Sequence, residues 1–365
     1  MRSIKSGIMI LATIFVELIF IFILMTVDVL PGQYMLAVAL VIAGIDGLII
    51  YLFGKEGKKS KKTIAAWIIS ALVALVMCFG IFYLYNTLDT MNKISGTGGP
   101  GNVPKSFNFL ISGIDSREDI SDDFARSDVN MIVTVNTETK TILLTSMPRD
   151  SYVPLHMNGE MDKLTHSGVY GIDETINTIQ DWLKVDIDYY ARVDFKMFKN
   201  LINAVGGIRV YNDTDFISHP KGWHYKKGWH DFTGKQALWF VRERKSFKNK
   251  DEKRIRNQQK VVKALIEKIT SSKTLMLNYI DILGAVEDNM QTNMSRSEMS
   301  SLAKMQIEDM SGWTIKRQSV DGEDAERGTW SMGPNRPLFV SIPKEESVKK
   351  VTKTINRTLN PDEEK

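Results

Sequence analysis

The sequence predicts an α/β domain, with a central sheet between layers of helices, that follows three membrane-spanning helices. Three observations carry this prediction: long apolar runs near the N-terminus, a lysine-rich loop between the second and third run, and alternating strand-like and helix-like segments from about residue 107. With 365 residues, 43% of them hydrophobic, the chain can bury a sizeable core. Its formal charge of +4 is nearly balanced, so any strongly basic segment is a local feature.

The apolar runs cover residues 7–27, 34–53 and 63–85 and contain no lysine or arginine. Each has the length of about 20 residues that a helix needs to cross a hydrocarbon core about 30 Å thick. The first run is too long for a signal peptide, lacks a clear cleavage site and is followed by two more runs. We therefore expect residues 1–85 to form a membrane anchor of three transmembrane helices.

The charges of the short loops predict the orientation of this anchor. Residues 55–62 read KEGKKSKK and hold five lysines, whereas the link VLPGQ between the first two runs holds no cation. Cytoplasmic loops carry an excess of lysine and arginine. The N-terminus and the lysine loop are therefore expected in the cytoplasm, and everything after residue 85 outside the cell.

The outer part begins with residues 86–106, which are rich in Gly, Ser, Thr and Asn and predict a flexible tether. A folded domain is expected over residues 107–343. The runs FNFLISGID, VNMIVTVNT and TILLTSMP indicate strands, residues 173–184 and 251–269 show helical periods, and WTIKRQSV indicates a late strand. The highly charged residues 344–365 are expected to be a frayed tail.

A basic run at residues 239–260, WFVRERKSFKNKDEKRIRNQQK, has nine cations and three anions. Such an excess can hold phosphates of DNA, of a lipid or of a phosphorylated substrate. The predicted topology places the run outside the cell, away from chromosomal DNA. We expect KSFKNKDEK to be a solvated loop, Glu243 to point away from its two arginine neighbours, and a helix to begin at RIRNQQK.

Several arginines follow strand-like runs, where α/β folds commonly place ligand sites. Guanidinium groups match phosphate oxygens, so arginines gathered in one crevice would suit a pyrophosphate. Asp115 and Asp128 accompany them, and one or two carboxylates beside phosphate oxygens make a typical Mg²⁺ site. The alternative is that each acid only forms a surface ion pair with an arginine. The arginines concerned are Arg117, Arg126, Arg149, Arg242 and Arg244.

Other chemistries find no support in the sequence. The single Cys78 lies in an apolar run, which leaves no disulfide framework, cysteine-based zinc site or thiol nucleophile. No Walker A, GxSxG or HExxH motif is present.

An ordered series of short motifs resembles the extracellular domain of LytR-CpsA-Psr (LCP) proteins. The resemblance covers residues 107–270, and the order of many motifs makes it specific. Two departures are that RQQ is replaced by NQQ, with Asn257 first, and that no accessory domain precedes GIDSR. The motifs are GIDSR, ARSDVNMIVTVN, TSMPRDSYV, DKLTHSGVYG, IDYYARVDF, NAVGGIRV, GWHDFTGKQALWFVRER and RIRNQQKVV.

The resemblance implies an extracellular α/β/α domain with a central mixed sheet, an apolar channel for a polyprenyl chain and an arginine-rich mouth for its pyrophosphate. Asp115 and Asp128 match the positions for Mg²⁺ (or Mn²⁺), and His166 matches a motif position with a hydrogen-bonding role. The implied pyrophosphate ligands, four of which would also be catalytic (Arg126, Arg149, Arg242 and Arg244), are Arg117, Arg126, Arg149, Lys163, Arg242, Arg244, Arg254 and Gln258.

The implied activity is that of a phosphotransferase in the cell membrane of a Gram-positive type of envelope. It would move a capsular, exopolysaccharide or teichoic-acid type glycan from undecaprenyl pyrophosphate to peptidoglycan and release undecaprenyl phosphate. Other polysaccharide-assembly proteins are further candidate partners, and nucleic acid is not expected. Two alternatives remain: a sensor or scaffold that binds the lipid-linked glycan without turnover and, more distant, a transcription regulator.

Overall fold

The computed structural model describes residues 2–54, 61–94, 103–114, 125–219, 222–248, 250–287 and 290–361. It divides into two compact units, Met1–Lys93 with Arg296–Asp309, and Ile94–Ser295 with Met310–Lys365.

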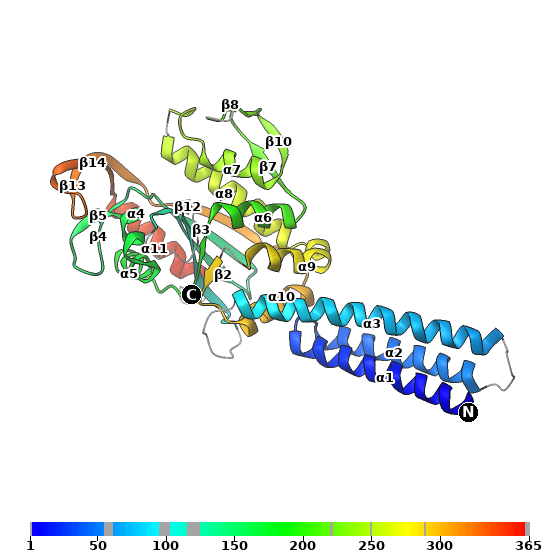
Figure 1. The fold of residues 1–365 in the computed structure, drawn as a ribbon. Helices are drawn as coiled ribbons and strands as arrows, with labels where there is room; N and C mark the ends of the chain where they lie inside the picture. The colour runs from blue at the N-terminus through cyan, green and yellow to red at the C-terminus, as the bar shows by residue number, and fades with distance from the viewer. Residues whose placement is uncertain are drawn as a thin grey trace. The chain divides into compact units, whose positions relative to one another are not determined.

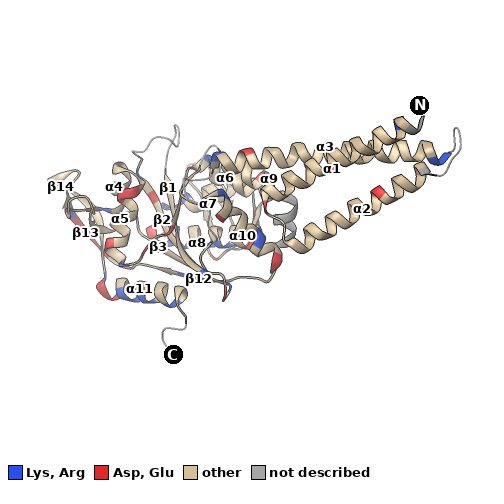
Figure 2. Ribbon diagram, turned by 90° about the horizontal axis from the view of Figure 1, so that it is seen from below, with Lys and Arg blue, Asp and Glu red and all other residues tan. Residues whose placement is uncertain are grey.

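The first unit is built on three long apolar helices (Figure 1), α1 (Arg2–Val27), α2 (Gly32–Gly54) and α3 (Lys61–Ile94). All three are long and apolar enough to cross a membrane, as predicted. Their middle stretches carry few charges in Figure 2, and large apolar side chains such as Leu11 and Phe79 are exposed along them. Such side chains suit a lipid environment.

The helix α3 differs from the prediction because it continues beyond residue 85 to Ile94. Asn86 and Thr87, expected in the flexible tether, lie within it and donate side-chain hydrogen bonds to the carbonyls of Phe82 and Tyr83. Residues 86–94 are therefore helical, and residues 95–102 lie outside the described residues.

A helix from far along the sequence, α10 (Arg296–Glu308), also belongs to the first unit. Ser300 Oγ donates a hydrogen bond to the carbonyl of Val27 (3.1 Å), and Lys304 Nζ lies 2.9 Å from the carboxylate of Asp28. The packing of this helix against the end of α1 has no signature in the sequence.

The second unit is organised around a six-stranded sheet with the order β11-β6-β1-β2-β3-β12. β2 pairs antiparallel with β1 and β3, β11 pairs antiparallel with β6, while β1–β6 and β3–β12 are parallel. The predicted central mixed sheet is thus confirmed. The strands are β1 (Ser106–Ile114), β2 (Ser127–Asn136), β3 (Thr141–Met147), β6 (Tyr189–Val193), β11 (Met290–Thr292) and β12 (Thr314–Ser319).

Helices cover both faces of this sheet. Neighbouring residues of a strand point to opposite faces, so the contacts of β3 show which helices lie on each face. Leu143 packs with Val351 and Ile355 of α11 (Glu345–Leu359) in one core cluster, which also includes residues of α5 (Ile172–Leu183). On the other face, Ser146 accepts a hydrogen bond from Gln259 of α8 (Lys250–Ile269). The α/β/α layering is therefore the one predicted.

The α11 helix corrects the predicted charged tail. Val351 and Ile355 are 2% and 0% exposed, so residues 345–359 belong to the folded core. Their high charge is explained by the exposed face of an amphipathic helix, on which several of the Lys and Arg residues lie (Figure 2).

A second core cluster joins the remaining helices to short hairpins. The helices are α6 (Phe195–Ala204), α7 (Gly234–Arg242) and α9 (Ser272–Val286), and the strands are β7 (Ile208–Asn212), β8 (Phe216–Ile217), β9 (His224–Tyr225) and β10 (Gly228–Phe232). The other elements are β4 (Tyr152–Pro154), β5 (Met161–Lys163), α4 (Leu164–Ser167), the 3-10 helix η1 (Gly168–Tyr170), β13 (Gly322–Thr329) and β14 (Gly333–Pro343).

Candidate functional site

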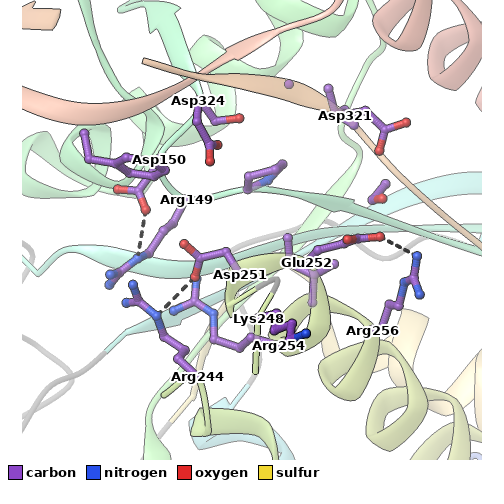
Figure 3. A pocket seen from close by; sticks show the side chains of 17 residues that line it. Arg149, Asp150, Arg244, Lys248, Asp251, Glu252, Arg254, Arg256, Asp321 and Asp324 are labelled. Carbon is purple, nitrogen blue, oxygen red and sulfur yellow. Dashed lines mark hydrogen bonds and ion pairs between the residues drawn. The ribbon is translucent and has the colours of Figure 1, made fainter. Parts of the chain in front are cut away.

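A hollow of about 680 Å³ lies where β3 and β12 end and α8 begins (Figure 3). β3 and β12 are parallel neighbours, so their carboxyl ends meet at the same edge of the sheet. Pro148 follows the last residue of β3, and Arg149 and Asp150 come next. The charged lining consists of five cations (Arg149, Arg244, Lys248, Arg254, Arg256) and five acids (Asp150, Asp251, Glu252, Asp321, Asp324).

Arg149 lies between two carboxylates. Its Nη1 donates a 2.8 Å hydrogen bond to Asp128 Oδ1, and its Nε lies 3.5 Å from Asp150 Oδ2. Burial alone lowers the pKa of Arg149, but the hydrogen bond to Asp128 and the charges of Asp128, Asp150 and Asp251 outweigh it and raise the pKa. The guanidinium is therefore held charged, and its side chain is a quarter exposed.

Lys163 forms an ion pair with Asp150, which also contacts Arg149: the Nζ of Lys163 lies 2.8 Å from Asp150 Oδ1. Asp150 is only 6% exposed and has a cation at each oxygen. Asp150 therefore bridges Arg149 and Lys163.

The motif DKLTHS, residues 162–167, includes Lys163 and is mostly buried. Asp162 Oδ1 and the Ser331 hydroxyl lie 2.6 and 2.9 Å from the same ring nitrogen of His166, Nδ1. Burial alone raises the pKa of Asp162, but hydrogen bonds from His166, Ser331 and the Lys163 backbone outweigh it and lower the pKa. The hydrogen-bonding position expected for His166 is thus a link between β5 and the β13–β14 turn.

On the opposite wall, Arg244 and Arg254 share the carboxylate of Asp251. Arg244 Nε and Arg254 Nη2 both lie 3.2 Å from Asp251 Oδ1. Burial, followed by the charges of Arg149 and Arg244, lowers the pKa of Arg254 despite the charges of Asp251 and Asp128. Arg149, Arg244 and Arg254 are therefore close enough to repel one another.

This arrangement suits an anion with several oxygens. Within the described residues, neither Arg149 Nε nor Arg254 Nε has a hydrogen-bond acceptor. The contacts of Asp251 with the two arginines are longer than the 2.7–2.9 Å typical of strong charge-assisted hydrogen bonds. A diphosphate could replace Asp251 as the partner of these guanidinium groups.

The structure does not bring every predicted residue into the hollow. Arg126 is exposed just before β2, and Gln258 of α8 is outside the lining. The Arg242 guanidinium lies 4.4 Å from the ring centre of Phe195 and 5.5 Å from that of Trp239. The roles of these three residues stay predictions, and Asp115 and Arg117 lie outside the described residues.

Two neighbours of these residues have defined environments. Glu243 is buried and accepts hydrogen bonds from the backbone amides of His219 and Ser246, so it points away from the hollow, as predicted. Asn257, the first residue of NQQ, is fully buried, and its amide has no hydrogen-bond partner among the described residues.

Asp128 fits the predicted role of a Mg²⁺ ligand. Its side chain is a quarter exposed, and the ion pair with Arg149 uses one of its two oxygens. Mg²⁺ prefers oxygen ligands and usually keeps several waters, so one or two carboxylates beside a phosphate suffice. In the described part of the chain no group of three or more His, Cys, Asp or Glu side chains could hold a metal.

Some lining residues were missed by the sequence analysis. Asp251 lies in the segment predicted as a solvated loop, but α8 already begins at Lys250, and Phe247 is buried in the core. The predicted solvated loop is therefore wrong for residues 250–253, whereas the helical period predicted over residues 251–269 is confirmed. An acid three residues before an arginine at a helix start was an available signal for Asp251. Asp321 and Asp324 had no such signal, because only the pairing of β12 with β3 brings them to the site.

The LytR_cpsA_psr family model matches residues 81–354. The chain is 31% identical over 285 residues to the polyisoprenyl-teichoic acid–peptidoglycan teichoic acid transferase TagU of Bacillus cereus. The matched region covers 74% of this chain and 92% of that relative. The crystal structure of Bacillus subtilis TagV is similar with a TM-score of 0.58 and 30% identity, covering 71% of this chain and 99% of TagV. A structure of TagT bound to LI-WTA is similar with a TM-score of 0.58 and 28% identity, covering 73% of this chain and 99% of that TagT chain.

Proposed function

The chain belongs to the LytR_cpsA_psr family, and we propose that it transfers a glycopolymer from a polyprenyl diphosphate carrier to peptidoglycan. One observation carries the proposal for this site: Arg149, Arg244 and Arg254 converge on one hollow at the edge of the sheet. The relatives named as transferases of teichoic acid to peptidoglycan support the class of reaction.

In the proposed reaction, a hydroxyl of a peptidoglycan sugar attacks the phosphorus that carries the glycan. The bond from that phosphorus to the bridging oxygen breaks, polyprenyl phosphate leaves with the electron pair, and the hydroxyl proton is released. Negative charge grows on the leaving phosphate, and preorganised cations stabilise such charge most effectively. Arg149, Arg244 and Arg254 would supply these cations.

The support residues would keep this geometry in place. Asp150 contacts both Arg149 and Lys163, so it would keep the two cations beside each other when the diphosphate binds. Asp128, with Asp115 where the resemblance predicts it, would hold Mg²⁺, which when bound would neutralise charge on the phosphate oxygens.

The proposed location is the outer face of the cell membrane. The lysine loop at residues 55–62 favours a cytoplasmic position for that end of the anchor. Peptidoglycan and a lipid-linked glycan would then both be accessible to the domain that follows α3. A carrier with an undecaprenyl chain and an apolar channel for it, as the resemblance implies, are part of the proposal.

The test measures transfer by the purified full-length protein from a lipid diphosphate donor. The quantity measured is the Mg²⁺-dependent release of lipid phosphate. Arg149→Ala should lower kcat/KM roughly 100- to 1,000-fold, the usual cost of one lost charge-stabilising donor. Arg149→Lys should recover only part of the lost kcat/KM, because lysine cannot form the bidentate hydrogen bonds of a guanidinium group.

Arg209→Ala is the matched control, because Arg209 is exposed on β7 and outside the lining. It should retain wild-type activity. Transfer by Arg149→Ala at the wild-type rate would refute the site. Binding of the donor without any release of lipid phosphate by the wild type would favour the sensor or scaffold instead.

A further inference from the structure

Two acids lie within the predicted membrane-spanning runs, Glu17 in α1 and Asp46 in α2. The three runs contain no lysine or arginine that could neutralise them. At 1.5 Å per residue, both acids lie about 10–15 Å from the ends of their runs that the predicted topology places in the cytoplasm, and so within the hydrocarbon core. Such a position is costly for an ionisable residue, which makes the pair a candidate site.

Glu17 is buried inside the helix bundle without a hydrogen-bond donor. It is 2% exposed, and neither of its carboxyl oxygens accepts a hydrogen bond within the described residues. Its carboxyl group interacts with that of Asp46 where α1 packs against α2. Two ionised carboxylates are both hydrogen-bond acceptors and repel each other. The pair therefore lacks the cation or donor that buried acids normally have.

Asp46 borders a face of α2 that consists of small residues. Ala39, Ala43 and Gly47 are spaced by four residues and therefore follow one another along one side of the helix. All three are exposed, and a Cβ added at Gly47 would have no atom of the described residues within 4 Å. Asp46 is half-buried and comes three residues after Ala43, on the same side. We call these four residues the α2 face.

We propose that the α2 face binds a transmembrane helix that carries a lysine or arginine near its middle, so that this protein associates with a second membrane protein through its anchor. Small residues at this spacing let two membrane helices approach closely, and the partner's cation neutralises the pair of Glu17 and Asp46. Charge complementarity favours this occupant over a second copy of the chain, because a second anchor brings two more acids and no cation within its spans.

The test measures energy transfer between the labelled full-length protein in phosphatidylcholine vesicles and two model peptides. Both peptides are leucine-rich helices of about 20 residues, and one has a lysine at its centre where the other has a leucine. The wild type should bind the lysine peptide roughly tenfold more tightly than the leucine peptide. Asp46→Asn should remove most of this difference and leave the binding of the leucine peptide unchanged.

Ala43→Leu tests the close approach without a change in charge. It should weaken the binding of the lysine peptide, because the larger side chain holds the partner's backbone away from the α2 face. Ala37→Leu is the matched control, since Ala37 is also exposed on α2 but lies six residues before Ala43, about 120° around the helix. It should bind both peptides as the wild type does.

Three results would overturn the proposal. Equal binding of both peptides by the wild type would leave the two acids as a pair that shares a proton. Equal effects of Ala43→Leu and Ala37→Leu would remove the α2 face as the contact. Energy transfer between two labelled copies of the protein that Ala43→Leu abolishes, and that the lysine peptide does not reduce, would assign the face to a dimer.

The inference goes beyond the proposed function and can fail separately from it. The peptide measurements need no lipid diphosphate donor and no turnover. Arg149→Ala should bind the lysine peptide as the wild type does, and Ala43→Leu should release lipid phosphate at the wild-type rate.

Discussion

Asp162 is a fully buried carboxylate whose hydrogen bonds hold the segment that carries Lys163. Its two oxygens hold His166 and the backbone amide of Ser331, and the next residue, Lys163, reaches Asp150 in the hollow. These bonds join β5, α4 and the β13–β14 turn behind Arg149. The position of Arg149 therefore depends on residues outside the lining of the hollow.

The lowered pKa of Asp162 predicts a loss of stability in acid. Because the folded-state pKa lies below the ordinary value of about 3.9, the bonds stabilise the fold fully above that pH. The contribution disappears as the pH falls through the folded-state pKa. The midpoint of thermal unfolding should therefore drop below about pH 4.

Asp162→Asn should lower the unfolding midpoint at pH 7 and flatten its dependence on acid. The exposed Asp231→Asn should leave both unchanged. Parallel acid profiles for wild type and Asp162→Asn would show that another group is responsible.

The strand-like run predicted before Arg242 and Arg244 is helix α7, and Arg254 lies in α8, so only Arg149 follows a strand. The motifs of the resemblance predicted Arg244 and Arg254. Arg149, Arg244 and Arg254 were expected together, and the structure brings them to one hollow. The stacking of Arg242 near Phe195 was not predictable, since the two residues are 47 positions apart and belong to different helices.

At the scale of elements, close packing of α6 and α7 depends on a glycine. α7 begins with a capping box formed by Thr233 and Gln236, and Gly234 is its first residue. A Cβ atom at Gly234 would lie 2.1 Å from the carbonyl oxygen of Lys199 in α6. The two backbones therefore approach too closely for any side chain.

Gly234→Ala should destabilise the protein by about 1–3 kcal/mol, because α6 and α7 must move apart. Gly284→Ala is a matched control in α9, where an added Cβ has no atom of the described residues within 4 Å. It should stabilise by about 0.5–1 kcal/mol, the usual preference for alanine within a helix. Chemical denaturation of both variants measures the difference, and equal effects would contradict the close contact.

At the scale of the whole molecule, α10 shows that sequence order and structural units differ. The chain passes from β11, a strand of the sheet, to α10 in the helical unit, and then to β12 of the same sheet. The predicted single domain over residues 107–343 is therefore interrupted by a helix that packs with the membrane anchor.

The orientation of the anchor is open to a direct test. Alkaline phosphatase, which is active only outside the cytoplasm, should be active when fused after residue 365. The same enzyme inserted in the lysine loop at residue 58 should be inactive, because positive loops remain inside. The opposite result would place the α/β domain in the cytoplasm, where it could not reach peptidoglycan, and would favour the transcription regulator.

The sequence by itself determined the three membrane helices, the mixed α/β sheet, the family and three arginines of the hollow (Arg149, Arg244 and Arg254), because apolar length, periodicity and contiguous motifs are local signals. Only the tertiary structure decided the remainder. It placed α11 in the core, put α10 against α1, and added Asp251, Asp321 and Asp324 to the hollow. Each of these depends on contacts between segments distant in sequence, which no local pattern records.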